Sequence, residues 1–324
     1  MAQATGTTDT YDLVGIAEDV EDMIHNISPE ETPLLTMLNK RKKEASNTLH
    51  QWQTDSLAAA AANRAIEGDE STYATAAPTT MLSNYTQISK KTVKVSGTAD
   101  KVRKYGRKKE SIYQTMKQGK NLKRDIEYAV CRNQASSAGG SATARSSAGL
   151  ESMISGNRIV AAANATGTTP GYSAGVWAAP TDGTSAAMTE GHLVSGLEAA
   201  WTDGGDASVI MTNTTLKRTI ATFGGAQKFA GFYNPNQGKA QGMVIGGVDT
   251  YISDFGEHKI VLNRHMRATT LFGLDPDHLS IAWLRNIVPE ERAKTGDAWN
   301  WELLCEFTLV TDNPDAHFKL QDFT

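Results

Sequence analysis

The apolar residues between positions 107 and 136 recur at the spacing of an α-helix. They are separated by four, six, four and then three or four residues, with Gly119 in the longest gap: Ile112, Met116, Leu122, Ile126, Ala129 and Val130. Polar and basic residues fill the other positions. One apolar stripe with polar flanks predicts an amphipathic helix. At 1.5 Å per residue, this helix would be about 40 Å long.

Two segments have the alternation of β-strands, and a long, weakly apolar stretch separates them. Residues 48–57 alternate around Trp52, and residues 85–97 are rich in β-branched and aromatic side chains. Between them lie about thirty residues, including the Ala58–Ala62 run and Glu67-Gly68-Asp69. Loops longer than about 15 residues are uncommon in compact domains and usually functional. The pattern predicts an extended two-stranded loop that leaves the body of the protein.

The N-terminal segment combines helix-start signals with one sign of charge. Ser28-Pro29-Glu30-Glu31 is typical of a capping box and predicts one helical turn at 29–31. Thr32-Pro33 repeats the signal and predicts a short helix over 33–39, capped by Thr32. Residues 1–39 contain eight acidic residues and no Lys or Arg. A segment of this kind does not fold alone, so we expect an arm that needs a partner surface.

Small residues dominate positions 139–190, which we expect to form a surface excursion or mobile segment. A few apolar side chains within it predict a docking point on the body: Leu150, Met153, Ile154, Ile159 and Val160.

A compact α/β unit is expected next. Thr189 caps a predicted helix that carries Leu193, Leu197 and Trp201 and ends at Gly204-Gly205. The run 209–211 reads as a buried strand, and Asn213 caps a second helix that ends at Gly224-Gly225. From residue 243 onward the pattern is mostly β, with strands expected over 243–254, 258–266, 269–274, 279–285, 299–311 and 316–321.

Composition narrows the class of protein without naming a chemistry. The 324 residues carry a net charge of −4, and this balance does not indicate binding to nucleic acid or to an anionic membrane. We expect neither a signal peptide nor a membrane-spanning helix. Cys131 and Cys305 form no CxxC pair, which favours two buried small side chains in a reducing compartment over a disulfide or zinc site.

One segment departs strongly from this balance. Residues 90–124 contain thirteen basic residues against only Asp100 and Glu110. A contact with an acidic neighbouring subunit, a face turned toward DNA phosphates and an ordinary solvated surface are all open interpretations. Aromatic residues do not interleave with the charges, which disfavours binding of single strands.

The candidate catalytic patterns are weak. The stretch 231–240 imitates a phosphate-binding loop, but it has six residues between its glycines and Ala240 where a hydroxyl is required. Asp275-Pro276-Asp277-His278 and the stretch 312–317 place carboxylates beside histidines, so metal binding or general acid–base chemistry is conceivable. Backbone turn geometry explains the same residues. We therefore expect no catalytic, cofactor-binding or metal-binding residues.

The stretch from Asn26 to Asp69 resembles the front end of tailed-bacteriophage major capsid proteins. The similarity rests on Asn26-Ile27-Ser28-Pro29, Thr32-Pro33-Leu34-Leu35 with Leu38, and Trp52-Gln53-Thr54-Asp55. It implies an α+β protein with the Hong Kong 97-type phage capsid fold. The implied parts are an N-terminal arm (1–47), an extended two-stranded loop (48–99), a long spine helix of the peripheral domain (100–138), the low-complexity excursion (139–188), an axial α/β domain (189–250) and a mainly β region completing the peripheral antiparallel sheet (251–324).

The resemblance also implies a function. The chain would be a structural subunit that self-assembles, through pentamers and hexamers, into an icosahedral shell around double-stranded DNA. A separate scaffolding protein, a portal or vertex protein and non-specifically contacted DNA are the implied partners, with no membrane; assembly would occur in the host cytoplasm and the product would be the virion capsid. The alternatives are an encapsulin-like nanocompartment shell and a two-domain enzyme that uses the Asp/His turns.

The expected inter-subunit contacts are charged or aromatic residues of the arm, the loop and the basic stretch. The arm acids are expected beside the basic residues of an adjacent chain. The candidates are Glu18, Asp19, Glu21, Asp22, Trp52, Asp55, Glu67, Asp69, Arg103, Lys104, Arg107, Lys108 and Lys109.

Overall fold

The computed structural model describes residues 22–24, 26–68, 70, 73, 75, 78–161, 167–223 and 249–324. Its α-helices are α1 (Pro33–Leu38), α2 (Gly97–Lys101), α3 (Glu110–Cys131), α4 (Leu150–Met153), α5 (Glu190–Thr202) and α6 (Thr214–Ile220). Short 3-10 helices cover Asn39–Arg41, Pro276–His278 and Pro314–Ala316. The strands are β1 (Lys43–Glu44), β2 (Leu49–Thr54), β3 (Thr80–Tyr85), β4 (Gln87–Ser96), β5 (Arg158–Ile159), β6 (Tyr172–Ser173), β7 (Val176–Trp177), β8 (Val209–Thr212), β9 (Thr250–Ser253), β10 (Gly256–Leu262), β11 (Leu271–Leu274), β12 (Leu279–Arg292), β13 (Ala298–Thr311) and β14 (Phe318–Leu320).

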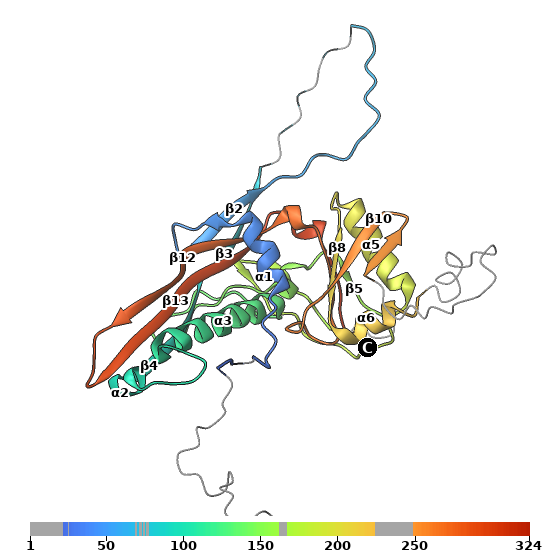
Figure 1. The fold of residues 1–324 in the computed structure, drawn as a ribbon. Helices are drawn as coiled ribbons and strands as arrows, with labels where there is room; N and C mark the ends of the chain where they lie inside the picture. The colour runs from blue at the N-terminus through green and yellow to red at the C-terminus, as the bar shows by residue number, and fades with distance from the viewer. Residues whose placement is uncertain are drawn as a thin grey trace, which may run out of the picture.

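Two sheets organise the subunit (Figure 1). The first has the order β1-β12-β13-β4 and is built around the long antiparallel β12–β13 ribbon, with α3 running alongside it. The second has the order β5-β14-β11-β8-β10-β9 and packs beside α5 and α6. The strand pair β2–β3 forms a separate two-stranded ladder from which the long loop departs.

The long amphipathic helix forms as the periodicity predicts, but its apolar stripe is only half used. Leu122 and Ile126 are completely buried under the first sheet, whereas Ile112 and Met116 are 57% and 63% exposed. The helix begins at Glu110, later than expected, because Asp100 accepts the backbone N–H of Ser111 at 3.0 Å and holds the preceding loop against its first turn. The N-terminal part of the stripe therefore faces outward in the isolated subunit.

The strand expected over 85–97 forms as β4, but a further strand, β3, precedes it and was not predicted. Residues 80–85 form β3 and pair with β2 at the base of the long loop. Residues 87–96 form β4 and pair with β13 in the first sheet. Strand β3 was missed because residues 80–85 contain few β-branched or aromatic side chains.

The start of the arm also differs from expectation. Residues 29–31 form no helical turn, so the predicted capping box is wrong. Helix α1 begins at Pro33 as predicted, but the Thr32 side chain makes no capping hydrogen bond. The first N–H groups of α1 are satisfied instead by a carboxylate from α3.

The small-residue stretch after residue 139 is not simply a surface excursion. Leu150, Met153 and Ile154 are completely buried in the main core, and β5 adds an edge strand to the second sheet. A Cβ atom on Gly149 would lie 1.9 Å from the carbonyl oxygen of Arg132, so only glycine permits this close approach. Here small residues reflect tight packing of backbone against backbone.

The second sheet also gathers more of the chain than the predicted axial segment. Only β8 and the edge strand β9 come from residues 189–253, and the other four strands come from 158–159, 256–262, 271–274 and 318–320. Helix α5 follows Thr189 as predicted and buries Leu193 and Leu197, but Trp201 is 63% exposed. The Gly224-Gly225 helix end and the imitation phosphate loop at 231–240 lie outside the described residues.

Candidate assembly surfaces

The extended loop between β2 and β3 stands away from the body (Figure 1). Every described residue from 55 to 79 is exposed. The exposed set includes large apolar side chains, with Leu57 and Tyr73 each 99% exposed and Ile66 82% exposed. Large apolar side chains that are exposed together are typical of a surface that another molecule covers.

The predicted contact residues of this loop fall into two groups. Trp52 lies in β2, is half-buried, and packs against the core at the base of the loop. Asp55 and Glu67 are exposed on the loop itself. Asp69 lies outside the described residues. Trp52 therefore anchors the loop to its own subunit, while Asp55 and Glu67 are placed to meet another chain.

The described end of the acidic arm contacts the basic stretch of the same chain. The Asp22 carboxylate accepts the backbone N–H of Gly106, in the loop between α2 and α3. Gly106 has a φ of +73°, a conformation that favours glycine. The other three predicted arm contacts, Glu18, Asp19 and Glu21, lie outside the described residues.

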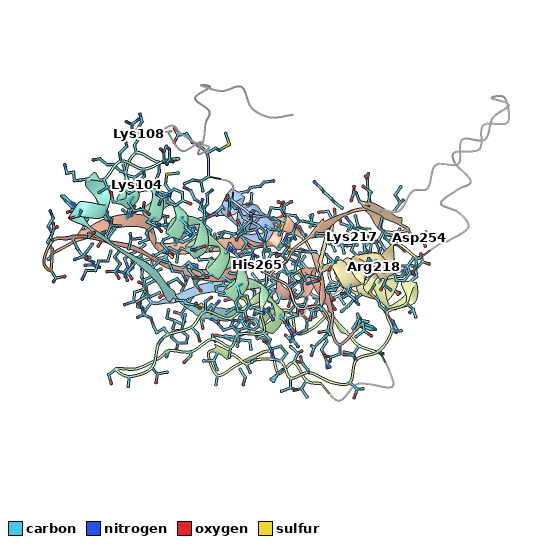
Figure 2. The ribbon with its side chains drawn as sticks, turned by 60° about the horizontal axis from the view of Figure 1, so that its bottom comes forward. Lys104, Lys108, Lys217, Arg218, Asp254 and His265 are labelled. Carbon is cyan, nitrogen blue, oxygen red and sulfur yellow. The ribbon has the colours of Figure 1, made fainter. Side chains whose placement is uncertain are left out.

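The basic residues around Gly106 are not equivalent. Arg107 is held within its own chain, because it pairs with Glu110 and its guanidinium lies 5.2 Å from the centre of the Tyr113 ring. Lys104 donates to the Val102 carbonyl at 3.2 Å. The remaining predicted contacts, Arg103, Lys108 and Lys109, are exposed. Figure 2 shows Lys104 and Lys108 together at the end of the molecule that carries this loop.

Further along, the arm crosses α3. Glu30 pairs with Lys120 at 2.7 Å, and Glu31 lies 3.8 Å from Arg264. Between the arm and the helix is a groove of about 340 Å³, lined in part by Ile24 and Met116. The arm thus lies along the basic face of α3 without covering it.

Glu127 is the functional side chain that sequence analysis missed. It is completely buried and accepts hydrogen bonds from the backbone N–H groups of Leu34 and Leu35 at 2.9 and 2.6 Å and from the Asn263 amide at 2.6 Å. Burial raises its pKa, and the three N–H donors oppose that rise. The available signal was a carboxylate next to Ile126, on the apolar side of a predicted helix.

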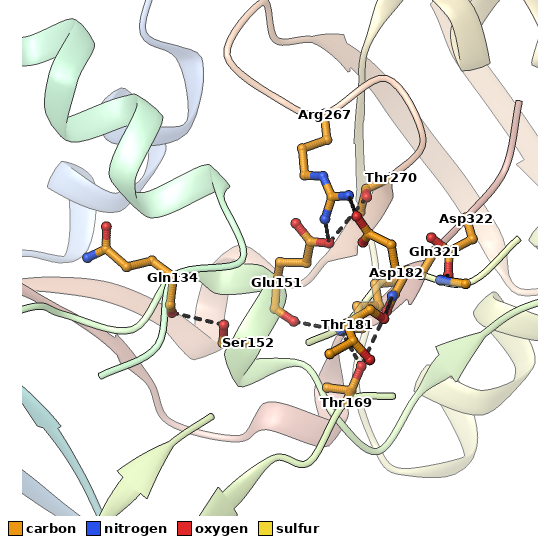
Figure 3. Close-up of polar contacts among 12 residues, drawn as sticks. Gln134, Glu151, Ser152, Thr169, Thr181, Asp182, Arg267, Thr270, Gln321 and Asp322 are labelled. Atoms are coloured by element: carbon orange, nitrogen blue, oxygen red, sulfur yellow. Dashed lines mark hydrogen bonds and ion pairs between the residues drawn. The ribbon is translucent and has the colours of Figure 1, made fainter. Parts of the chain in front are cut away.

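A second buried polar cluster joins the end of the chain to the small-residue segment (Figure 3). Arg267 donates to the Glu151 carboxylate at 2.8 Å and to that of Asp182. Lys319, completely buried, donates to the Glu151 backbone carbonyl at 2.6 Å and to Thr169 Oγ1 at 2.9 Å. The cluster fixes α4 and the segment around Thr169 to β14.

Burial controls the ionisation of this cluster. Removal from water lowers the pKa of Lys319 to about 7, although the Glu151 charge works in the opposite direction. Burial also raises the pKa of Glu151, against the attraction of Arg267 and Lys319. Both shifts favour the neutral form, which is the expected response of groups held away from solvent.

The Asp/His turns serve the backbone. The Asp275 carboxylate accepts the N–H groups of Asp277 and Asp206 and bonds to His278 Nδ1 at 2.9 Å. His317 Nδ1 accepts the N–H of Asp275 at 3.0 Å, and burial lowers the pKa of His317 to about 4. Within the described residues, no group of three or more His, Cys, Asp or Glu side chains is arranged to hold a metal ion. These contacts explain the turns without a reaction.

The described helices include none that is both long and apolar enough to span a membrane.

Comparison with known proteins gives a consistent result. A family model described as SU10 major capsid protein matches residues 3–324. A curated relative, the major capsid protein of Escherichia phage Phieco32, is 39% identical over 127 residues, which are 39% of this chain and 36% of the relative. The match therefore spans little more than a third of that relative.

Solved structures share the fold over nearly the whole chain. The capsid asymmetric unit of cyanophage A-1(L) aligns with a TM-score of 0.67 at 16% identity, covering 98% of both chains. The capsid of cyanophage P-SCSP1u aligns with a TM-score of 0.57 at 12% identity, covering 99% of both. Mycobacterium phage Che8 gives 0.57 at 12% identity, covering 95% of this chain and 97% of the other. The predicted α+β capsid fold is confirmed.

Proposed function

The chain belongs to the SU10 major capsid protein family, and from this premise we propose that its copies assemble into the closed icosahedral shell of a tailed phage, around double-stranded DNA. The observation that carries the proposal is the loop between Thr54 and Thr80. Its described residues are all exposed, and its large apolar side chains Leu57, Ile66 and Tyr73 are not covered by the described part of the chain. A neighbouring subunit would supply that surface.

The proposed mechanism is geometric. Each loop reaches over an adjacent copy, and the units built on the second sheet meet around local five-fold and six-fold axes as pentamers and hexamers. Individual contacts are weak, but a closed shell repeats each of them many times, and this multivalency gives a stable particle.

The acidic arm and the basic stretch form the second proposed contact. Asp22 already lies against the Gly106 loop within one chain. We infer that Glu18, Asp19 and Glu21, which precede it in the acidic arm, pair with Arg103, Lys108 or Lys109 of an adjacent copy. Exposed pairs contribute only about 0–1 kcal/mol each, so their effect would emerge from repetition.

The remaining partners follow from the role of a shell protein. A separate scaffolding protein, a portal or vertex protein and non-specifically contacted DNA are proposed. Assembly would take place in the host cytoplasm, and the chain would end in the virion. No enzymatic activity is proposed, because the Asp/His turns are explained by backbone contacts.

Replacement of the loop tests this proposal. Residues 57–78 are exchanged for a Gly/Ser linker of equal length, which keeps the β2–β3 ladder closed but removes the exposed apolar side chains Leu57, Ile66 and Tyr73. For the wild-type protein, sedimentation velocity should show particles or rings of five or six subunits. For the variant, it should show only folded monomers. Assembly of the variant at the wild-type concentration would refute the role of the loop, and an unfolded variant would mean that the loop belongs to the core.

A further inference from the structure

The first half of α3 carries an apolar strip that the described part of the chain leaves uncovered. Ile112 and Met116 lie one helical turn apart and are 57% and 63% exposed. Exposed lysines lie at both ends of the strip, since Lys109 precedes Ile112 by three residues and Lys117 follows Met116. From Lys109 to Lys117 the chain would rise about 12 Å along a helix. An apolar strip with a basic rim fits an amphipathic segment that carries acidic side chains.

The sequence of residues 12–21 has this chemistry. At about 100° per residue, four apolar side chains share one side of a helix: Leu13, Ile16, Ala17 and Val20. On the same helical projection, Asp12, Asp19 and Glu21 flank the apolar side and Glu18 lies opposite it. The segment therefore has the pattern of a short acidic amphipathic helix.

A helix of this length needs a surface to pack on. Isolated helices shorter than about 12–15 residues are marginal in water, and Gly15 lowers the helix propensity further. The segment ends next to Asp22, whose carboxylate accepts the backbone N–H of Gly106, shortly before α3 begins. Its end is thus anchored close to the kind of surface that its apolar side requires.

The path of the described arm favours the surface of another copy. Glu30 pairs with Lys120 and Asp22 contacts Gly106, so the arm runs from the middle of α3 toward its start as residue numbers fall. Residues before Asp22 would have to reverse direction to lie on Ile112 and Met116 of their own chain. The same strip on an adjacent copy can be reached without that reversal.

The charges of the two surfaces are complementary. Residues 12–21 contain four acidic residues and no Lys or Arg, whereas residues 108–117 contain three lysines and one acid, Glu110. Glu110 is already paired with Arg107 and accepts a hydrogen bond from Gln114 at 2.6 Å. The lysines are therefore left to attract the acidic segment, and opposite charges of this kind steer association and fix its register.

We propose that residues 12–21 of one copy form a short helix that packs Leu13, Ile16 and Val20 on the strip of Ile112 and Met116 of an adjacent copy. This inference rests on the proposed function, which brings the copies together, and it adds an apolar docking surface to the charge pairs proposed there. Because the helix forms only when two copies meet, folding of this part of the arm is coupled to assembly.

Disulfide cross-linking of assembled particles tests the contact. The variant Val20→Cys/Met116→Cys places one cysteine on each surface, and the native Cys131 and Cys305 are buried and do not compete. A disulfide requires Cα atoms within about 7 Å of each other. After mild oxidation, a non-reducing gel should show dimers and longer ladders of linked chains, because each copy both donates and receives an arm. The matched control Glu18→Cys/Met116→Cys, with its cysteine on the opposite side of the helix, should link several-fold less.

Three results would overturn the proposal. A fast-migrating, internally linked monomer would place the segment on its own chain, unlinked chains would mean that another molecule covers the strip, and equal linking in the control would remove the helical register. If Val20→Cys/Met116→Cys does not assemble, Ile16→Cys/Ile112→Cys replaces it, and the same ladder is expected. Electron microscopy of the wild-type protein separates the two claims. Absence of wild-type particles would refute the proposed function, whereas particles whose variants give no ladder would refute this inference alone.

Discussion

The carboxylate of Glu127, deep in α3, accepts the backbone N–H of Leu35 at 2.6 Å, across 92 residues of sequence. The same carboxylate accepts the N–H of Leu34, so a buried side chain of the spine helix caps the first turn of the arm helix α1. Negative charge at a helix N-terminus is stabilising. Since Leu34, Leu35 and Leu38 are buried together in the main core, this contact sets where the arm leaves the body.

Replacing Glu127 with Gln should release that contact. The amide retains the shape of the carboxylate but turns one oxygen into a donor that faces another N–H group. We expect a loss of about 1–3 kcal/mol in the free energy of unfolding, measured by urea denaturation. Hydrogen exchange at Leu34 and Leu35 should accelerate more than elsewhere. Glu291→Gln, at an exposed position of β12, is the control and should change neither quantity.

A carboxylate introduced into the apolar stripe of α3 should destabilise the subunit in the buried half of the stripe but not in the exposed half. Ile126→Asp buries a carboxylate at a completely enclosed position, so we expect a loss of several kcal/mol and a collapse of soluble yield. Ile112→Asp, on the same helix but 57% exposed, should leave the thermal midpoint of the subunit nearly unchanged. Equal stability of the two variants would contradict the observed phase of the helix.

The pKa of Lys319 predicts a pH dependence of stability. Burial lowers it from the usual 10.5 to about 7, so between those values the unfolded chain binds more protons than the folded chain. Stability should therefore rise as pH increases through this window. Urea midpoints at pH 7.5 and 9.5 test this: Lys319→Met should reduce the rise, and Lys94→Met, at an exposed position, should not. If the stability of Lys319→Met rises with pH as much as that of the wild type, another group causes the pH dependence.

The arm prediction is tested by charge reversal. Changing Glu18, Asp19, Glu21 and Asp22 to Lys should impair assembly at low salt, measured by light scattering. Reversing exposed bases of the partner loop to Glu should restore it in part: Arg103, Lys108 and Lys109. Because the Debye length is about 8 Å at physiological ionic strength, the wild-type contact should weaken as salt is added. Unchanged assembly of the arm variant at low salt would refute the pairing.

Sequence periodicity identified the elements whose stability is local or regular. The long helix, α1, α5 and the strands of the C-terminal region follow from apolar spacing and capping residues. Periodicity did not reveal that Ile112 and Met116 face outward, because apolar residues have the same spacing whether the surface that covers them is in the same chain or another.

Local sequence patterns could not predict the contacts between segments that are distant in sequence. Glu127 caps a helix formed by residues far away in sequence, and a single carboxylate in an apolar stripe does not indicate its partner. The small-residue stretch after residue 139 was expected to be a surface excursion that docks through Leu150, Met153 and Ile154, and these three side chains are buried in the main core. Only glycine fits at position 149, because the backbone of Arg132 passes so close. Composition alone does not show whether small residues are present because of such tight packing or because the segment is exposed.

Negative-stain electron microscopy of the purified full-length protein, over a concentration series and with a scaffolding protein added, tests the central claim most directly. The account predicts closed particles of uniform diameter, or rings of five and six subunits at lower concentration. A monodisperse monomer at every concentration, with and without scaffold, would contradict it.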